Sequence, residues 1–261
     1  MDLGIKGKTA LVLGASQGIG AGIARALAAE GCNVIVGARR EDVLAELVAE
    51  LKSKNGVEAE AYSIDMTDKA AVAAMCEKIQ GEWQPEILLN NAGGPPGGYI
   101  IGVDDEIWEA SLQALLMSVI RISEAALEAM IERQWGRILT VTSSGVIAPI
   151  PTIPVSNVVR SGIVSYSKTL ANEVAKHGIT VNTIIPGRID TERTVNMDKF
   201  ASEKQGISVE DVQKKSWAQI PAGRYGSVEE FADVAAFLLS ARASYVTGSQ
   251  IRIDGGTIKN V

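Results

Sequence analysis

The feature that most constrains the fold is a short apolar run that leads directly into a cluster of glycines and then into a helix-forming stretch. The run covers residues 9–13, the glycines are Gly14, Gly18 and Gly20, and an alanine-rich stretch follows them. A strand that is buried on both faces reads as a continuous apolar run, and glycines between a strand and a helix permit a tight turn. This order predicts a parallel α/β sheet that begins with a strand, a turn and a helix.

The rest of the chain repeats this alternation of short β-branched runs and long amphipathic stretches. We predict strands at 9–13, 33–37, 58–64, 86–89, 137–142, 179–185 and 250–253, all buried on both faces, and helices at 18–30, 41–54, 69–81, 104–133, 155–176 and 228–240. The pattern predicts an α/β protein with a single-domain Rossmann fold over residues 1–261, in which helices cover both faces of a doubly wound, seven-stranded parallel sheet. The polar region 196–220, with a predicted helix at 209–217, is expected to form a substrate lid.

The glycine-rich turn is predicted to bind the pyrophosphate of a dinucleotide. Gly14 permits the tight turn, Gly18 lets a pyrophosphate approach the backbone, and Gly20 lets the helix pack closely on the strand. The start of the helix offers free N–H groups and the positive end of a dipole to the anion. The alternative is an ordinary glycine cluster between a strand and a helix. The residues predicted to line this part of the site are Gly14, Ser16, Gln17, Gly18, Ile19 and Gly20.

Two arginines at the end of the second predicted strand favour NADP(H) over NAD(H). An acidic residue there would accept hydrogen bonds from a ribose 2′-hydroxyl, whereas arginine pairs with a 2′-phosphate. This sequence has Arg39 and Arg40 and no acid before the next helix. The alternative is that the two arginines are solvated residues at the start of that helix.

Composition and charge exclude several classes of function. The net charge of −6 and the absence of a run of basic residues argue against nucleic acid as a partner. No apolar segment approaches the length that spans a bilayer, and the N-terminus lacks the apolar region of a signal peptide, so we expect a cytoplasmic protein without a membrane partner. The two cysteines, Cys32 and Cys76, and the one histidine, His177, predict no metal site.

Several motifs, in order along nearly the whole chain, resemble those of the short-chain dehydrogenase/reductase family, and within it the 3-oxoacyl-carrier-protein reductases. Besides the glycine-rich turn, they are Asp65, the segment from Asn90 to Gly93, Pro186-Gly187 with Thr191, Tyr245 to Gly248, and Asp254 to Gly256. The resemblance implies that Asp65 and Met66 flank the adenine and that Asn91, Ala92 and Gly93 line the ribose side. It implies that Pro186, Gly187, Ile189 and Thr191 hold the nicotinamide. It also implies a small-molecule substrate and a homotetramer, or a homodimer, built on the fourth and fifth crossover helices.

The same family relies on an Asn, a Ser, a Tyr and a Lys for catalysis, and three of these four are replaced here. An alignment without gaps places Leu115 at the Asn position, Ser143 at the Ser position, Ser156 at the Tyr position and Arg160 at the Lys position. Arg160 is expected to hold the ribose hydroxyls and to favour a developing oxyanion, but it does not relay protons at neutral pH. A serine hydroxyl is a much weaker acid than a tyrosine phenol.

Other polar residues near the predicted site are weaker candidates for replacing the missing groups. Tyr166 and Lys168 do not form a displaced Tyr-Lys pair, because a spacing of two puts them on different sides of a helix. Tyr99 is expected to anchor its loop by packing. Arg188 is a better candidate than Arg193 for binding an acidic substrate, since it directly follows the turn expected at the nicotinamide.

The sequence therefore supports three functional hypotheses. The leading one is an NADP(H)-dependent oxidoreductase of a divergent short-chain type, acting on a carbonyl or alcohol, with Ser143, Ser156 and Arg160 polarising the substrate oxygen. The second is a protein that binds the dinucleotide without turning it over, as a redox sensor or an inactive subunit. The third is a non-redox enzyme, such as a lyase or isomerase, that uses the same cleft.

Overall fold

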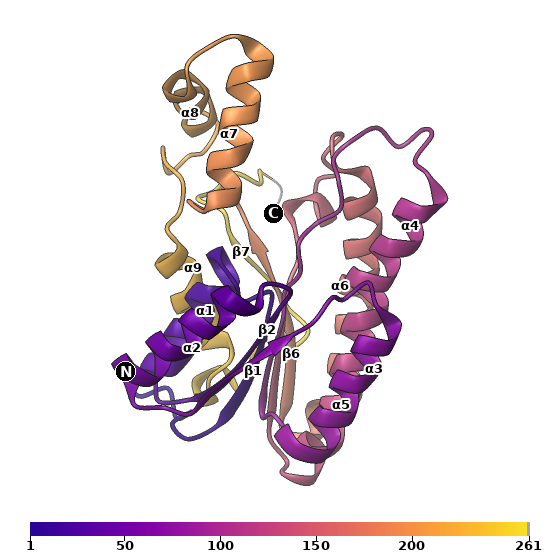
Figure 1. Ribbon diagram of the computed structural model, residues 1–261, viewed down its shortest axis with the longest axis vertical. Coiled ribbons are helices and arrows are strands. Elements are labelled where there is room, and N and C mark those ends of the chain that lie inside the picture. Colours follow the sequence, from indigo (N-terminus) through magenta and orange to yellow (C-terminus); the bar gives the residue numbers. More distant parts are fainter. Residues whose placement is uncertain (260–261) are drawn as a thin grey trace.

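Seven parallel strands form one sheet at the centre of the protein in a computed structural model, which describes residues 1–259 (Figure 1). The strands are β1 (Thr9–Leu13), β2 (Asn33–Ala38), β3 (Ala59–Ser63), β4 (Ile87–Asn90), β5 (Gly136–Val141), β6 (Ile179–Pro186) and β7 (Gln250–Ile253). Their order is β3-β2-β1-β4-β5-β6-β7, so the order reverses direction between β1 and β4. In open α/β sheets, ligands bind in the crevice at such a reversal, beyond the carboxyl ends of the strands.

Helices cover both faces of this sheet, as the sequence predicts. The helices are α1 (Gly18–Ala29), α2 (Glu41–Asn55), α3 (Lys69–Lys78), α4 (Asp105–Leu112), α5 (Ser118–Glu132), α6 (Pro154–Val174), α7 (Glu192–Gln205), α8 (Val209–Trp217) and α9 (Val228–Leu238). One apolar core joins α1, α2 and α9 to one face of the sheet, and a second joins α3, α5 and α6 to the other. Figure 1 shows these two layers on either side of the strands.

Local chemistry explains where several helices begin. The Asp68 carboxylate accepts hydrogen bonds from two backbone N–H groups at the start of α3, and the Thr191 and Ser208 hydroxyls cap α7 and α8 in the same way. Ser227 and Glu230 form a capping box at the start of α9. Each cap satisfies N–H groups that have no partner within the helix.

Burial differs between the centre and the edges of the sheet. All residues of β5, and nearly all residues of β1 and β6, are buried. The edge strands β3 and β7 are only partly buried, so the prediction that every strand is covered on both faces is wrong for these two. An edge strand has a neighbour on one side only, which leaves more of its side chains exposed.

Two predicted helices are interrupted, and one helix was not predicted. The predicted helix at 69–81 ends at Lys78 and continues as a π-helical turn, η1 (Ile79–Trp83), and the predicted helix at 104–133 is divided by a second one, η2 (Gln113–Met117). In the predicted lid region, the helix at 209–217 is present as α8, and α7 precedes it. In Figure 1 these two helices extend beyond the carboxyl ends of the strands. Within the described residues, no helix is both long and apolar enough to span a membrane.

Candidate cofactor and substrate site

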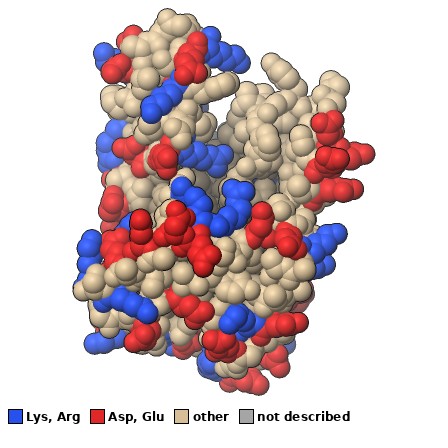
Figure 2. All heavy atoms as spheres, in the orientation of Figure 1, with Lys and Arg blue, Asp and Glu red and all other residues tan. Residues whose placement is uncertain are grey.

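A large cleft opens at the carboxyl ends of the central strands, where the strand order reverses. Its volume is about 1210 Å³, and it runs from the glycine-rich turn to η2 on one side and to the start of α7 on the other. Figure 2 shows lysine and arginine side chains at the floor of the hollow between the two upper lobes of the molecule. The arginines that line the cleft are Arg39, Arg40 and Arg193.

Most of the predicted cofactor residues lie along this cleft. Those that line it are Gly14, Ser16, Gln17, Gly18, Ile19, Arg39, Arg40, Asp65, Met66, Asn91, Ala92, Gly93 and Thr191. The other predicted residues, which do not line it, are Gly20, Ser143, Ser156, Arg160, Pro186, Gly187 and Ile189. The first group comes from the ends of β1, β2, β3 and β4 and from Thr191 after β6, so the fold brings together five segments that are distant in the sequence.

Close backbone packing explains two of the three glycines in the turn. A Cβ atom on Gly20 would lie 2.2 Å from the carbonyl oxygen of Gly14, and one on Gly14 would lie 2.6 Å from the carbonyl oxygen of Asn91. Gly14 also has a φ of +62°, which other residues avoid. The Asn91 side chain donates a hydrogen bond to the Gly14 carbonyl at 3.2 Å, which ties the loop after β4 to the turn.

The start of α1 has the properties of an anion site. Gln17 occupies the N-cap position without a side-chain hydrogen bond to the helix, and no acidic residue lies in the first turn. The first N–H groups therefore have no side-chain acceptor, unlike those of α3, α7, α8 and α9. A Cβ on Gly18 would lie 3.3 Å from Thr191 Cγ2, so a larger residue would fill the space beside these groups. A pyrophosphate fits a cradle of this kind.

The two arginines after β2 line the end of the cleft where the adenosine is predicted to bind. Arg40 donates a hydrogen bond to the Gln17 side chain in the glycine-rich turn. The Thr67 backbone and side chain donate to Asp65, and these bonds, with a contribution from the charge of Arg39, lower the pKa of that carboxyl group. Asp65 is therefore ionised at neutral pH, and Arg39 has no ion pair among residues 1–259 at the distance of a salt bridge.

Arg160 spans the ends of β4 and β5 beneath the cleft. Its guanidinium donates hydrogen bonds to the carbonyl oxygens of Val141 at 2.8 Å and Ala92 at 2.9 Å. Burial lowers the pKa of this group to about 10, and the charge of Arg193 adds to the effect. Arg160 is thus a buried cation that donates hydrogen bonds to neutral carbonyls, and these contacts position it directly behind Ala92, a cleft residue.

The two serines predicted to be catalytic lie close to the same strand end. Ser143 follows β5 and accepts a hydrogen bond from the Gly145 backbone N–H at 3.2 Å, while Ser156 is buried in the first turn of α6. Asn157, next to Ser156, is a polar residue that sequence reasoning missed. A Cβ on Gly145 would lie 2.1 Å from Asn157 Oδ1, so Gly145 allows the loop after β5 and the start of α6 to approach.

A π-helical turn determines which residue faces the cleft from the α4–α5 segment. Leu115 lies in η2, is buried, and lines the cleft together with Ser111 and Ile107 from α4. Turns of this type add a residue to the helical repeat and so rotate the following side chains. No Tyr, Lys, His or Cys is among the residues that line the cleft within the described part of the chain.

The predicted lid is attached to the body by one buried acid. Asp198 on α7 is 1% exposed and accepts hydrogen bonds from Arg188 Nη1 at 3.1 Å and from the Tyr225 hydroxyl at 3.0 Å. Arg188, the better sequence candidate for an acidic substrate, is therefore occupied by this contact. Arg193 instead lines the cleft. In the sequence, Asp198 is one acid in a polar stretch, and no local signal distinguishes it.

Three aromatic and basic residues considered from the sequence lie away from the reacting region. Tyr99 is 84% exposed, so the expectation that it anchors its loop by packing is wrong. Tyr166 packs against the core formed by α3, α5 and α6, and burial raises its pKa. His177 lies at the end of α6 in η4 (Ala175–His177), at the opposite end of the sheet from the cleft. Among the described residues, no cluster of His, Cys, Asp and Glu has the composition of a metal site.

Comparisons with known proteins agree with this arrangement. The family model for enoyl-(acyl carrier protein) reductase matches residues 14–257. The chain is 37% identical over 257 residues to the 3-oxoacyl-[acyl-carrier-protein] reductase FabG of Escherichia coli (strain K12), covering 97% of this chain and 98% of the relative.

Solved structures give the same result. The L-sorbose reductase of Gluconobacter frateurii, complexed with NADPH and L-sorbose, has a TM-score of 0.95 and 34% identity, with all of both chains covered. YwfH, an NADPH-dependent reductase involved in bacilysin biosynthesis, has a TM-score of 0.93 and 29% identity, covering 98% of this chain and all of that one. With the fold, the glycine-rich cradle and these relatives in agreement, the chain belongs to the short-chain dehydrogenase/reductase family.

Proposed function

We propose that this protein is an NADP(H)-dependent oxidoreductase that reduces a carbonyl group, or oxidises the corresponding alcohol, at an active site that lacks the Asn, Tyr and Lys of its family. The observation that carries the proposal is the steric fit of the turn, where a Cβ on Gly20 would lie 2.2 Å from the Gly14 carbonyl oxygen and the start of α1 has no side-chain cap. Relatives from the same family are complexed with NADPH.

The preference for NADP(H) follows from the positive charge after β2. Arg39 and Arg40 line the adenosine end of the cleft together with Asp65, whose pKa the charge of Arg39 helps to lower. A charge-assisted hydrogen bond from a guanidinium to a phosphate is stronger than one between neutral groups. Arg39 is the better candidate for the 2′-phosphate, because Arg40 already donates to Gln17.

The reacting end is proposed to work through Ser143, Ser156 and Arg160. When bound, NADPH supplies a hydride to the carbonyl carbon, and the carbonyl oxygen needs one proton to become a hydroxyl. In this proposal Ser156 donates that proton and regains one from water, and Arg160 provides the positive charge that favours the oxyanion. Because a serine is a weaker acid than the missing tyrosine, we expect turnover about 10² to 10⁴ times lower than with a phenolic donor.

A substrate panel tests this function. Ketones, diketones and 3-oxoacyl thioesters are incubated with the protein and NADPH, and loss of NADPH absorbance is measured. We expect slow oxidation above background, about tenfold slower in Ser156→Ala with an unchanged affinity for NADPH. Ser165→Ala, an exposed position on the same helix, is the matched control and should behave as the parent protein.

A second candidate function is binding of the dinucleotide without turnover, as a redox sensor or an inactive subunit. The observation that favours it is that no Tyr, Lys, His or Cys lines the cleft in the described residues. Micromolar binding of NADPH with no oxidation by any substrate of the panel would support this candidate over the enzyme. A lyase or isomerase would transform a substrate without consuming the cofactor, which analysis of the products would detect.

Exposed apolar side chains on the helices after β4 and β5 offer a surface for assembly. We propose a homotetramer, or a homodimer, built on the helices at 105–132 and 154–174, because Leu112, Met117 and Val158 on them are exposed apolar side chains. Light scattering after size exclusion should give the mass of four or two chains, and the mass of a monomer would contradict this proposal.

A cytoplasmic location is also proposed. Cys32 and Cys76 are free thiols, and a reducing compartment keeps cysteines in this state.

A further inference from the structure

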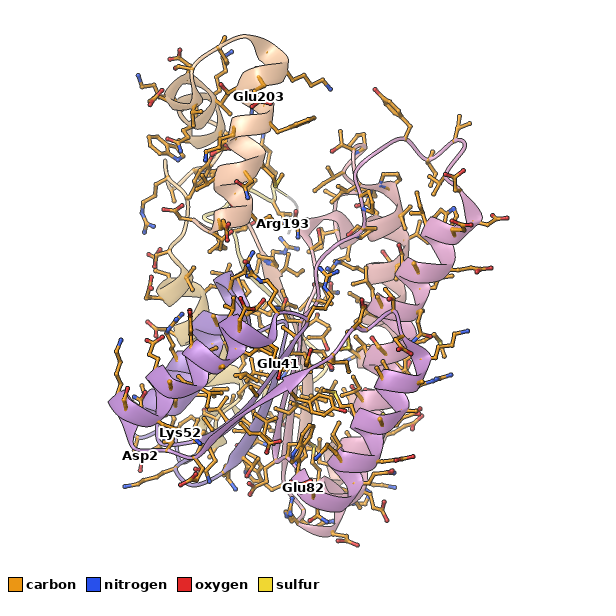
Figure 3. The ribbon with its side chains drawn as sticks, in the orientation of Figure 1. Asp2, Glu41, Lys52, Glu82, Arg193 and Glu203 are labelled. Carbon is orange, nitrogen blue, oxygen red and sulfur yellow. The ribbon has the colours of Figure 1, made fainter. Side chains whose placement is uncertain are left out.

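One face of α7 is directed at the cleft and combines a charge with apolar side chains. The residues on this face follow the first of them by three, four and seven positions, which places them on the same side of a helix. They are Arg193, Asn196, Met197 and Phe200. Arg193 and Asn196 line the cleft, and Figure 3 shows Arg193 at the end of α7 nearest the sheet. Met197 is 48% exposed and Phe200 is 67% exposed, further along the same face.

The opposite side of α7 is fixed to the body. Thr194 is buried and donates a hydrogen bond to the Ile189 carbonyl at 2.5 Å, and Asp198 is held by Arg188 and Tyr225. These contacts set the rotation of the helix about its axis. The face that carries Arg193 is therefore held toward the cleft.

Arg193 is a cation without an acidic partner in the described structure. No carboxylate of residues 1–259 lies within ion-pair distance of it, whereas Arg188 in the same segment is paired with Asp198. Its guanidinium lies close to Gly94, since a Cβ there would be 3.4 Å from Nη2. Arg160, the buried cation behind Ala92, adds positive charge to the same region. Two cations that have no ion pair within the described residues attract an anion.

The opposite rim of the cleft is apolar. Three exposed side chains lie in the loop that continues from the cleft residues Gly93 to Pro96, separated from them by two glycines: Tyr99 is 84%, Ile100 52% and Ile101 91% exposed. In Figure 1 their loop, before α4, lies across from α7. The cleft thus has positive charge in its lining, and exposed apolar side chains lie beyond it on α7 and on the loop before α4.

We propose that Arg193 binds a carboxylate of the substrate, and that the substrate is an oxo acid whose apolar group packs against Met197 and Phe200. This inference rests on the proposed function and names the substrate class for it. The other anion that Arg193 can meet is a phosphate of the cofactor, and the test below separates the two sources.

Calorimetry on the protein saturated with NADP⁺ tests the proposal without turnover. The ligands are 2-oxo-4-phenylbutanoate, its ethyl ester, which keeps the ketone and phenyl ring but removes the charge, and pyruvate, which keeps the acid but lacks the ring. We expect the phenyl acid to bind about tenfold tighter than the ester, which lacks the charge-assisted bond, and about tenfold tighter than pyruvate, which lacks the ring; each factor corresponds to about 1.4 kcal/mol.

Variants assign the preference to individual side chains. Arg193→Met should bring the affinities for acid and ester to within about twofold of each other, and Arg193→Lys should keep part of the preference. Phe200→Ala should weaken the binding of the phenyl acid but leave the binding of pyruvate unchanged. Lys199→Met removes an exposed cation on another side of α7 and is the matched control.

Three results would overturn the inference. The first is equal affinity for acid and ester, or no saturable binding of the acid. The second is an Arg193→Met variant that keeps the acid preference. The third is a loss of NADP⁺ affinity in Arg193→Met with the acid preference unchanged, which would assign this arginine to the cofactor's phosphate. If NADP⁺ itself fails to bind, the proposed function falls as well, so the two failures are distinguishable.

Discussion

The two ends of the cleft are built by different means. At the adenosine end, the shape comes from backbone packing between Gly14, Gly20 and Asn91, three residues in or beside two loops. At the substrate end, it comes from side chains on η2, α6 and α7 that reach across the molecule, such as Arg160 and Asp198. At the first end, the close backbone contacts leave no room for a side chain larger than that of glycine. At the second end, one side chain can be replaced by another, which changes the chemical groups that the cleft presents. If the proposed function holds, this difference lets the residues at the substrate end change without disturbing the cofactor cradle.

The largest effect is expected where the backbone packs most closely. Gly20→Ala places a Cβ 2.2 Å from the Gly14 carbonyl oxygen, so the turn must shift away from the position that receives the pyrophosphate. We expect NADPH affinity to fall on the order of 100-fold, the upper end of the cost of overpacking. Calorimetry measures the affinity, and circular dichroism monitors the fold.

Gly81→Ala is the matched control, since a Cβ on Gly81 meets nothing within 4 Å. If Gly20→Ala bound NADPH as tightly as Gly81→Ala does, the glycine-rich turn would not be the pyrophosphate site. The contrast between the two ends of the cleft would then lose its basis.

A smaller effect is expected from the charge after β2. Arg39→Ala should lower the affinity for NADPH by about tenfold and the affinity for NADH by less than about twofold. Only NADPH carries the 2′-phosphate that the guanidinium is proposed to bind. Binding of both cofactors is measured by calorimetry, and NADH serves as the internal control. Equal losses for the two cofactors would remove the basis for choosing NADP(H).

At the substrate end, a change in the attachment of α7 should leave the cofactor unaffected. Asp198→Asn keeps the size of the side chain but removes the charge that pairs with Arg188, while Tyr225 retains an acceptor. We expect a loss of about 1–2 kcal/mol in the free energy of unfolding and a several-fold rise in KM, with NADPH affinity unchanged. Denaturant titration and steady-state kinetics test this. A parallel loss of NADPH affinity would show that the two ends are coupled.

The smallest effect is expected from pH. Burial lowers the pKa of Arg160 to about 10, so its charge is present below that value and is lost as pH rises through it. No residue lining the described cleft is a His, Cys, Tyr or Lys, and we therefore expect kcat/KM for carbonyl reduction to be flat from about pH 7 to 9 and to decline near pH 10. A titration with a midpoint near neutral pH would reveal a proton donor that this account lacks.

The sequence predicted the sheet because the signals for it are local. Each buried strand is a continuous apolar run, so all seven strands were located to within a few residues, including both edge strands. The cleft residues after β1 and β2 were predicted from the glycine-rich turn and the two arginines, whereas those after β3 and β4 came from the family resemblance.

The substrate end was harder to predict because its contacts join residues that are distant in the sequence. α7 was missed because its composition is polar, although Thr191 at its start and Gly206 at its end are local signals for a helix. The partners of Arg160, the carbonyls of Val141 and Ala92, lie 19 and 68 positions away. The pairing of Arg188 with Asp198, which leaves Arg193 in the cleft, depends on the fold of the lid and has no local pattern.

Calorimetry with NADPH and NADH on the unmodified protein tests the central claim most directly, because every other proposal depends on the dinucleotide cradle. The account predicts saturable binding of one NADPH per chain, about tenfold tighter than NADH. An absence of heat and of saturation with both cofactors, in their reduced and oxidised forms, would contradict it.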